Sequence, residues 1–378
     1  MQLFFYCIGK HMKKICAFLG IGLCTSTAVF SAPNDSLLVA KDFNAPYKSA
    51  LNMTFAIDAV NDTIDVLDMR ESEGITDSSA GDYQGLHLAA AYQISPQWSI
   101  EGIYWHREIE YTQDTNKLQS ALIGARYTPN LNLHKNDALS FRASIWGNTA
   151  NTLTKSTATK VNQRTFQQVH VEEPQDFQLQ LDGIFSRKLD PMNQLNAFAS
   201  FGYSKVEVNK LQLQAMHQGC LMNVSIDSSN TYTGNLAKPC KTGNITITDL
   251  AISGNANEFG LDIQKDLNYD SYFASIGGSW NWRHKAFESQ IGYQYQRLWR
   301  DQIDDRVSSF GSAPIKDNHT LSLKLSYDFT PQITGFVQGD MYQNNFVGYI
   351  PFLYNGVTAS RLDKRYGLAS LGIQARLF

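Results

Sequence analysis

The chain has 378 residues, of which 43% are hydrophobic and 18% are charged, and its formal net charge at pH 7 is −3. Beyond the first 31 residues, no apolar run approaches the roughly 20 residues that a membrane-spanning helix needs, which argues against a helical membrane protein. The mildly acidic balance gives no support to a nucleic-acid partner.

The first 31 residues have the order of a secretory signal peptide: a charged start, an apolar stretch and small residues. Lys13 and Lys14 precede the apolar run 15–23, and Ser31 is a small residue at the expected cut. We therefore expect cleavage after Ser31 and export of the remaining chain.

Residues 32–49 are polar and are interrupted by Pro33 and Pro46. Within them, 35–40 (Asp-Ser-Leu-Leu-Val-Ala) resembles the box by which TonB-dependent receptors engage their energy transducer. Those receptors are far longer and carry a plug domain, for which this chain has no room. We therefore interpret 32–49 as a short periplasmic segment that leads into the main domain.

Two cysteines remain after the predicted cleavage, Cys220 and Cys240. An even pair in an exported protein predicts a disulfide. Closing a loop of about 20 residues should stabilise the folded state by about 3 kcal/mol on the chain-entropy model. The sequence has no C-x-x-C motif and no His/Cys cluster, so we expect neither a metal site nor a cofactor.

From residue 50 onward one unit repeats: a segment in which apolar and polar residues alternate, a turn, and another alternating segment. In the clearest example, Leu321, Leu323 and Leu325 share one face, and Ser322 and Lys324 share the other. A period of two is typical of β-strands with one apolar face. We count twelve such segments, which begin near residues 53, 86, 98, 117, 137, 177, 195, 272, 287, 320, 333 and 366.

The connections between these segments alternate in length. Those at 95–97, 129–136, 189–194, 283–285 and 330–332 are short, those at 71–83, 148–175, 208–269, 301–317 and 347–363 are long, and only 112–117 breaks the alternation. Short turns on one side and long loops on the other are typical of transmembrane β-barrels. The sequence therefore predicts an all-β fold, a transmembrane antiparallel up-and-down β-barrel over 50–378.

Aromatic residues give an independent indication of a membrane barrel. Those near the short-turn ends of the segments are Tyr92, Trp98, Tyr127, Trp280, Trp282, Phe287, Tyr327, Phe329 and Phe378. Aromatic rings are enriched where barrel strands cross the lipid interface. The core of a soluble β-sandwich would not collect them at one end.

The last segment carries the most specific signal. Leu371, Ile373 and Leu377 share one face, and the chain ends at Phe378. An apolar outer face and a terminal aromatic residue resemble the closing strand of Gram-negative outer-membrane β-barrels, including porins. The resemblance implies an outer-membrane location, contact with lipid, and recognition of Leu377 and Phe378 by the barrel-assembly machinery. We also expect this strand to pair with the one that starts near Met53.

The longest connection, 208–269, leaves the number of strands open. Alternation around Ile245 and Ile247, and from Phe259 to Ile263, could form a hairpin outside the membrane or add two strands to give fourteen. The two cysteines lie in its most polar part, which favours an external loop stapled by the disulfide.

Charged residues expected on the inward face are the candidate site. They are Glu101, Arg107, Arg126, Arg142, Asp182, Glu288, Lys324, Asp328, Asp340 and Arg376. Opposing charges in a lumen select solutes in channels, whereas in a narrow barrel the same residues pair and fill the interior. We predict a narrow porin-like channel for passive diffusion of small polar solutes. The alternative is a non-conducting barrel whose stapled loop binds a surface ligand or partner.

An enzymatic role is less favoured. Outer-membrane phospholipase and some lipid A deacylases use a His-x-Ser pair on one strand, and no histidine here has Ser two residues later. We therefore expect no catalytic residues and no enzymatic activity.

Overall fold

The structure is a computed structural model, and it describes residues 35–40, 51–61, 64, 65, 67, 69, 81–131, 133–161 and 164–377. The predicted signal peptide and the terminal Phe378 lie outside the described residues. Within the described ranges, none of the helices is long and apolar enough to cross a membrane.

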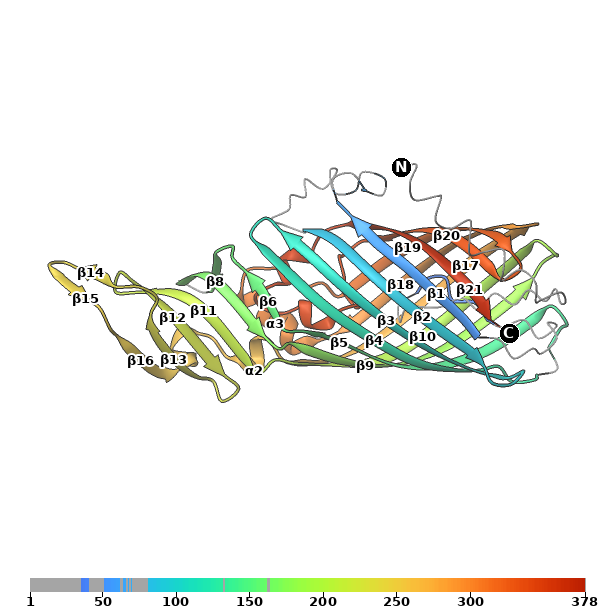
Figure 1. Cartoon of the computed structure of the whole chain (residues 1–378). Coiled ribbons are helices and arrows are strands. Elements are labelled where there is room, and N and C mark those ends of the chain that lie inside the picture. Colours follow the sequence, from blue (N-terminus) through green and yellow to red (C-terminus); the bar gives the residue numbers. More distant parts are fainter. Residues whose placement is uncertain are drawn as a thin grey trace, which may run out of the picture.

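Twelve antiparallel strands close into a barrel (Figure 1). They are β1 (Leu51–Val60), β2 (Asp82–Gln93), β3 (Trp98–Tyr111), β4 (Asp114–Tyr127), β5 (Asp137–Ala150), β9 (Gln175–Lys188), β10 (Asn193–Glu207), β17 (Tyr269–His284), β18 (Phe287–Trp299), β19 (Asp317–Thr330), β20 (Ile333–Tyr342) and β21 (Tyr366–Leu377). Their order around the wall follows the chain. The predicted twelve-stranded barrel is confirmed, and the fourteen-stranded alternative is wrong.

The barrel closes where the last strand meets the first. Leu51 is opposite Leu377 and Met53 is opposite Ala375, in an antiparallel register without a bulge. This confirms the predicted pairing of the two strands. Because every strand of the barrel has two neighbours, no main-chain edge is left open toward lipid.

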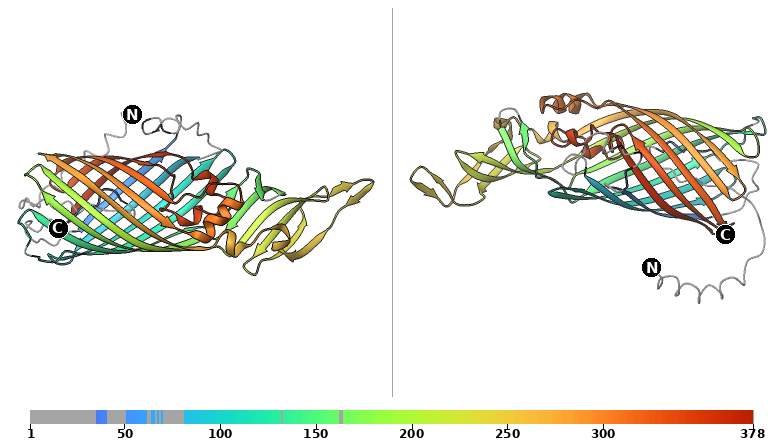
Figure 2. Two further views of the ribbon diagram at one scale, coloured as in Figure 1. Left: turned by 180° about the vertical axis from the view of Figure 1, so that it is seen from behind. Right: turned by 90° about the horizontal axis from the view of Figure 1, so that it is seen from above.

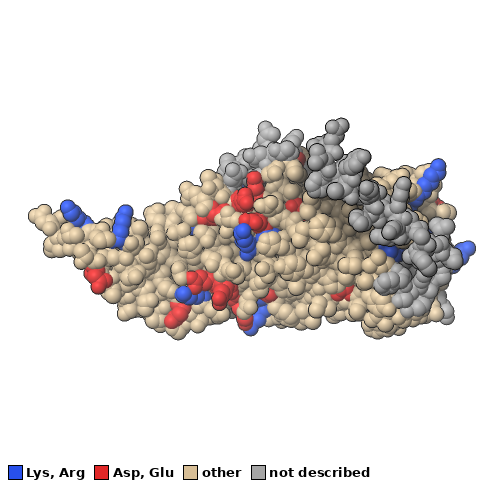
Figure 3. Space-filling view, viewed as in Figure 1, with Lys and Arg blue, Asp and Glu red and all other residues tan. Residues whose placement is uncertain are grey.

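The alternation of side chains sorts the wall into an apolar outside and a polar inside. On β9, Phe177, Leu179 and Leu181 are exposed, whereas Gln178 and Gln180 are buried. Charged side chains are sparse on the visible part of the barrel wall (Figure 3). An apolar outer band around a polar interior is the pattern of a transmembrane barrel.

The two ends of the barrel differ. At the turn end, strands are joined by short connections such as 285–286 and 331–332, and the rings of Trp98 and Tyr127 lie 4.7 Å apart. At the loop end, the connections include 151–174, 208–268, 300–316 and 343–365. The turn end also holds the C-terminal end of β21 (Figure 1).

A second sheet, the distal sheet, projects from the loop end (Figures 1 and 2). It contains β6 (Thr152–Lys155), β7 (Thr159–Val161), β8 (Arg164–Glu172), β11 (Lys210–His217), β12 (Cys220–Asp227), β13 (Thr231–Leu236) and β16 (Ala251–Asn255). Three of these strands prolong barrel strands, since β6 follows β5, β8 precedes β9 and β11 follows β10 within one to two residues. The connections 151–174 and 208–268 therefore build one body outside the barrel.

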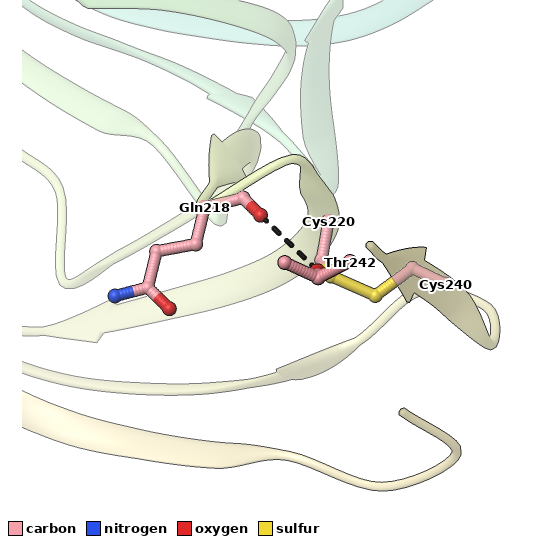
Figure 4. Close-up of a disulfide and its surroundings, with 4 residues drawn as sticks. All are labelled: Gln218, Cys220, Cys240 and Thr242. Carbon is pink, nitrogen blue, oxygen red and sulfur yellow. Dashed lines mark hydrogen bonds between the residues drawn. A yellow bond between two sulfur atoms is a disulfide. The ribbon is translucent and has the colours of Figure 1, made fainter. Parts of the chain in front are cut away.

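A small hairpin extends the distal sheet, formed by β14 (Cys240–Thr242) and β15 (Ile245–Ile247). A disulfide joins Cys220 to Cys240, with 5.5 Å between the Cα atoms (Figure 4). The predicted disulfide is confirmed. It attaches the hairpin to the start of β12.

Helical segments lie in the connections at the loop end. They are the 3₁₀ turns η3 (Ala256–Phe259), η4 (Pro351–Leu353) and η5 (Ala359–Arg361) and the α-helices α2 (Ile263–Asp266) and α3 (Asp301–Ser309). Their buried apolar residues form one continuous cluster with those of the distal sheet. The main hydrophobic core therefore lies at the loop end and not in the middle of the barrel.

Candidate functional site

The inner wall of the barrel carries many small or uncharged polar side chains, together with large apolar ones such as Trp105, Trp146 and Phe198. Buried polar examples are Ser120, Ser140, Ser144, Gln178, Gln180, Ser200, Ser204, Ser271, Ser275, Gln290, Gln294, Thr320 and Ser322. They alternate with the lipid-facing apolar residues, as the sequence pattern predicts.

Three of the predicted inward charges form one buried group. The Arg142 guanidinium donates through Nε to Glu101, at 2.5 Å, and through Nη1 to Asp182, at 3.1 Å. Arg142 is only 1% exposed. A buried arginine between two carboxylates is charge-compensated and costly to break, because removing one partner leaves an unpaired charge.

A second charged group lies near the turn end. Arg283 pairs with Glu288, at 3.3 Å, and with Asp328. The sequence pattern predicts Arg283 in the turn between two strands, so its role as the shared partner was missed. The register of β17 against β18 puts Arg283 opposite Glu288, and this register was not known from the pattern alone.

The other predicted candidates also lie on the lumen side. Arg107 donates to Ser120, Arg376 donates to Asn52 at 3.4 Å, and Asp340 accepts bonds from Ser322 and Gln338. Lys324 lies 4.2 Å from the centre of the Phe336 ring, and Arg126 donates to the main-chain oxygen of Val39. All ten candidates face the interior, but they are spread along the wall and do not form one ring.

One charge pair was not anticipated as a pair. His87 Nδ1 lies 3.0 Å from Asp58 Oδ2. In β1, Asp58 lies between the apolar residues Ile57 and Ala59, which face the other side of the strand. The inward position of its carboxylate was therefore predictable from the sequence.

Residues 35–40, called the lumen segment here, lie inside the barrel. Leu37 and Leu38 are each 1% exposed, and Leu38 packs with Ile184 and Phe198 of the wall. The amide of Ala40 donates to Ser186 of β9, at 2.9 Å. The sequence pattern predicts a periplasmic lead-in for this stretch, whereas the structure places it within the lumen because its apolar side chains find apolar wall residues there.

The lumen segment crosses the interior from one wall to another. The Val39 oxygen accepts from Arg126 of β4, and the Ser36 oxygen packs against Gly292 of β18. In the twelve-stranded wall, β18 is the fifth strand after β4, so the two strands lie on nearly opposite sides. The segment therefore obstructs the lumen.

The connection 343–365, called the mouth loop here, closes the loop end. Its main-chain oxygens accept bonds from Asn148 of β5, at 3.2 Å, from Asn318 of β19, at 2.9 Å and 3.0 Å, and from Tyr269 of β17, at 2.7 Å. The Phe352 amide donates to Asp176 of β9, at 3.2 Å. These partners lie on nearly opposite walls, so the loop spans the mouth.

Two cationic side chains latch the far part of the mouth loop. Arg361 pairs with Asp114 of β4, at 3.1 Å, and its guanidinium stacks 3.9 Å from the Tyr111 ring. Lys155 of β6 donates to the Val357 oxygen, at 2.7 Å. Burial, together with the charge of Arg361, lowers the pKa of Lys155 to about 8.

Helix α3 supports the mouth loop from outside. Tyr354 donates to Asp304, at 2.8 Å, and the Arg300 guanidinium lies 3.6 Å from the Tyr354 ring. Burial raises the pKa of Asp304 above its ordinary value, although Arg300 opposes this shift. Tyr354 is 1% exposed and belongs to the continuous core of the loop end.

Among the described residues, no group of three or more His, Cys, Asp and Glu side chains is arranged to hold a metal ion.

No protein-family model matches the sequence, and no curated protein matches it. Solved structures that match the chain include the translocator domain of autotransporter NalP from Neisseria meningitidis, at 7% identity and a TM-score of 0.43, covering 88% of this chain and 90% of that one. The NanC porin has 10% identity and a TM-score of 0.38, with 87% and 100% covered. The toluene transporter TodX of P. putida has 10% identity and a TM-score of 0.34, with 91% and 92% covered.

Twelve antiparallel strands, full closure, an apolar outer band, short turns at one end and long loops at the other are all present. The chain has the architecture of an outer-membrane β-barrel. Two segments outside the barrel wall, the lumen segment and the mouth loop, obstruct its lumen.

Proposed function

We propose that the protein is an outer-membrane channel for passive diffusion of small polar solutes, held in a closed state by the lumen segment and the mouth loop. The observation that carries the proposal is the nature of the obstruction. It consists of two segments that are not barrel strands, whereas the wall behind them presents polar side chains such as Ser144, Ser200 and Ser275 between larger apolar ones such as Trp146 and Phe198. Displacing these segments would remove the chain that blocks the lumen.

The charges of the wall support a preference for small polar solutes over strongly charged ones. Arg142 is compensated by Glu101 and Asp182, and Arg283 by Glu288 and Asp328. Compensated pairs create local fields without a large net potential of one sign. On this basis we propose transport of small polar solutes.

This proposal is tested by measuring the conductance, in a planar bilayer, of variants from which one or both obstructing segments have been removed. The Asn345 amide donates to the Lys364 oxygen, at 3.0 Å, so the two ends of the mouth loop meet. Residues 346–363 can therefore be replaced by a four-residue Gly/Ser turn. In a second variant, 35–40 are replaced by six Gly/Ser residues, which keeps the chain length.

We expect rare or no conductance steps from the wild type, and discrete steps from the protein that carries both replacements. A matched control replaces 241–246 at the tip of the distal hairpin, which lies far from the lumen (Figure 1), and should behave as the wild type. A doubly replaced barrel that inserts into the bilayer but never conducts would overturn the channel proposal. That result would favour the alternative, a closed barrel that presents the distal sheet for binding.

A further inference from the structure

The distal sheet contains a cavity of about 450 Å³ that plays no part in the proposed conduction. Its floor is formed by Phe166 of β8, Leu213 of β11 and Met222 and Val224 of β12. The opposite wall is formed by Phe259 and Leu261. Ligand sites in proteins are concave, mostly apolar and about 300–1,000 Å³ in volume, so the size and lining fit a small molecule.

The second wall of the cavity is held firmly across the face of the sheet. Asn230 donates to Asn257 and to the Leu261 oxygen, both at 3.1 Å, and accepts from the Ile263 amide, at 3.1 Å. The rings of Tyr232 and Phe259 meet edge to face, with centres 4.9 Å apart. The cavity is therefore a built feature of the fold, with both walls fixed by named contacts.

Within the described residues, the rim of the cavity is polar and carries no carboxylate, ammonium or guanidinium group. It is formed by Thr165, Gln167, His217 and Gln218, and no Lys, Arg, Asp or Glu is among its described lining residues. Such a rim offers hydrogen bonds to a ligand. A charged ligand would lose its hydration there without gaining a counter-ion.

The disulfide positions this rim. Cys220 follows the turn that carries Gln218, and Thr242 beside Cys240 donates to the Gln218 oxygen, at 3.5 Å (Figure 4). The stapled hairpin thus holds the side of the cavity where a polar group of a ligand would lie.

We propose that this cavity is a binding site for a small, uncharged, mostly apolar molecule whose hydrogen-bonding end lies at His217 and Gln218. The apolar body of the molecule lies between Leu213 and Met222 on one side and Phe259 and Leu261 on the other. The site does not depend on whether the barrel conducts.

Photolabelling of the full-length protein in lipid nanodiscs tests this site. Three probes share a phenyl trifluoromethyl diazirine: the parent compound, a derivative with a hydroxymethyl group, and a derivative with a carboxylate. After irradiation, mass spectrometry of peptides locates the adducts. Probe dissolved in the bilayer labels the lipid-facing barrel peptides without saturating. These peptides therefore serve as the reference for non-specific labelling.

We expect saturable labelling of peptides 164–169 and 211–224 by the two uncharged probes, and at least tenfold weaker labelling by the carboxylate at neutral pH. Ala215→Trp should abolish the saturable labelling, because Ala215 lines the cavity. Gln214→Trp is the matched control. The Gln214 side chain bonds Asn223 on the other face of β11, so its replacement should leave labelling unchanged.

His217→Ala gives a second readout that does not require filling the cavity. It should reduce the affinity of the hydroxymethyl probe about fivefold, which corresponds to the loss of one hydrogen bond. The affinity of the parent probe should not change. Labelling of the distal sheet that does not saturate, or that Ala215→Trp leaves intact in a folded barrel, would overturn the site. Equal labelling by the carboxylate probe would overturn the assigned ligand class.

Discussion

The main-chain oxygen of Ser36 occupies the space where a side chain on Gly292 would begin. A Cβ atom added to Gly292 would lie 2.2 Å from that oxygen, far inside van der Waals contact. Gly292 faces the lumen from β18, between the inward-facing Gln290 and Gln294. The absence of a side chain at this position is what allows the lumen segment to cross the barrel.

Gly292→Ala should therefore displace the lumen segment. In the background of the shortened mouth loop, we expect the conductance of this variant to approach that of the barrel whose 35–40 stretch has been replaced. Gly183→Ala is the matched control, since a Cβ atom there meets nothing within 4 Å. If both alanine variants conduct like the parent, the lumen segment does not obstruct the passage.

A second prediction concerns the latch between Arg361 and Asp114. Both residues are 5% exposed, so Asp114→Asn leaves a buried guanidinium without its charged partner. Breaking a buried pair in this way costs about 3 kcal/mol, which corresponds to about a hundredfold rise in the population of the open mouth loop. Chymotryptic cleavage after Phe352 and Tyr354, both nearly fully buried, measures this opening.

The matched control for the latch is Asp317→Asn. Asp317 pairs with Arg297 at 3.0 Å, but both side chains are more than a third exposed. Exposed pairs contribute about 0–1 kcal/mol, so cleavage of the mouth loop should change little in this variant. A similar rate for Asp114→Asn and Asp317→Asn would show that the latch does not hold the loop.

A third prediction is a pH dependence of the closed mouth loop. The pKa of Lys155 is about 8 when the loop is closed and should return to its ordinary value, near 10.5, when Lys155 becomes solvated. Between these values the open state binds more protons, so raising the pH favours closure. Chymotryptic cleavage should slow from about pH 8 to about pH 9.5, by at most about tenfold per pH unit.

Lys155→Met should remove this slope, because no group with a lowered pKa then remains at the contact with Val357. The window ends near pH 9.5 because burial raises the pKa of Tyr354, which also lies in the mouth loop. Above about pH 10, ionisation of Tyr354 in the open state favours opening and reverses the trend. Equal slopes for the wild type and Lys155→Met would contradict the assignment.

The strands were predictable because each combines length with strict alternation. On β19, Leu321, Leu323 and Leu325 face outward while Ser322 and Lys324 face inward, and lipid on one side imposes this pattern over 14 residues. The inward direction of the ten candidate charges follows from the same alternation. Their partners could not be predicted, because pairing depends on register between strands.

The sequence left open whether the lumen is filled, and the segments that obstruct it were not predicted, although the mouth loop carried a signal. Phe346, Ile350, Phe352, Leu353 and Tyr354 are too apolar for an exposed connection, and such a group must be buried somewhere. The lumen segment gave no comparable signal. Its apolar residues 37–40 are too few to show a period, and their wall partners lie about 100 or more residues away in the chain.

A fourth prediction concerns the disulfide. Replacing Cys220 and Cys240 by Ser removes a constraint that should contribute about 3 kcal/mol to the stability of the distal hairpin. We expect faster tryptic cleavage after Lys241, which lies in β14 and pairs with Thr246 of β15, with no change in the folding of the barrel. Treating the wild type with a reductant should give the same cleavage pattern. An unchanged rate would mean that strand pairing alone holds the hairpin.

The final prediction concerns closure of the barrel. Leu377 pairs with Leu51 at the turn end, and the pairs continue without interruption to Ala59 and Ala369. Deleting Leu377 and Phe378 removes one of these pairs and the terminal aromatic residue that the resemblance to outer-membrane barrels identifies as an assembly signal. Most of the β1–β21 pairing remains, so the folded barrel should lose little stability. We therefore expect a lower yield of membrane-inserted protein but unchanged conductance and protease resistance in the fraction that inserts. A normal yield from the truncated chain would show that assembly does not depend on these two residues.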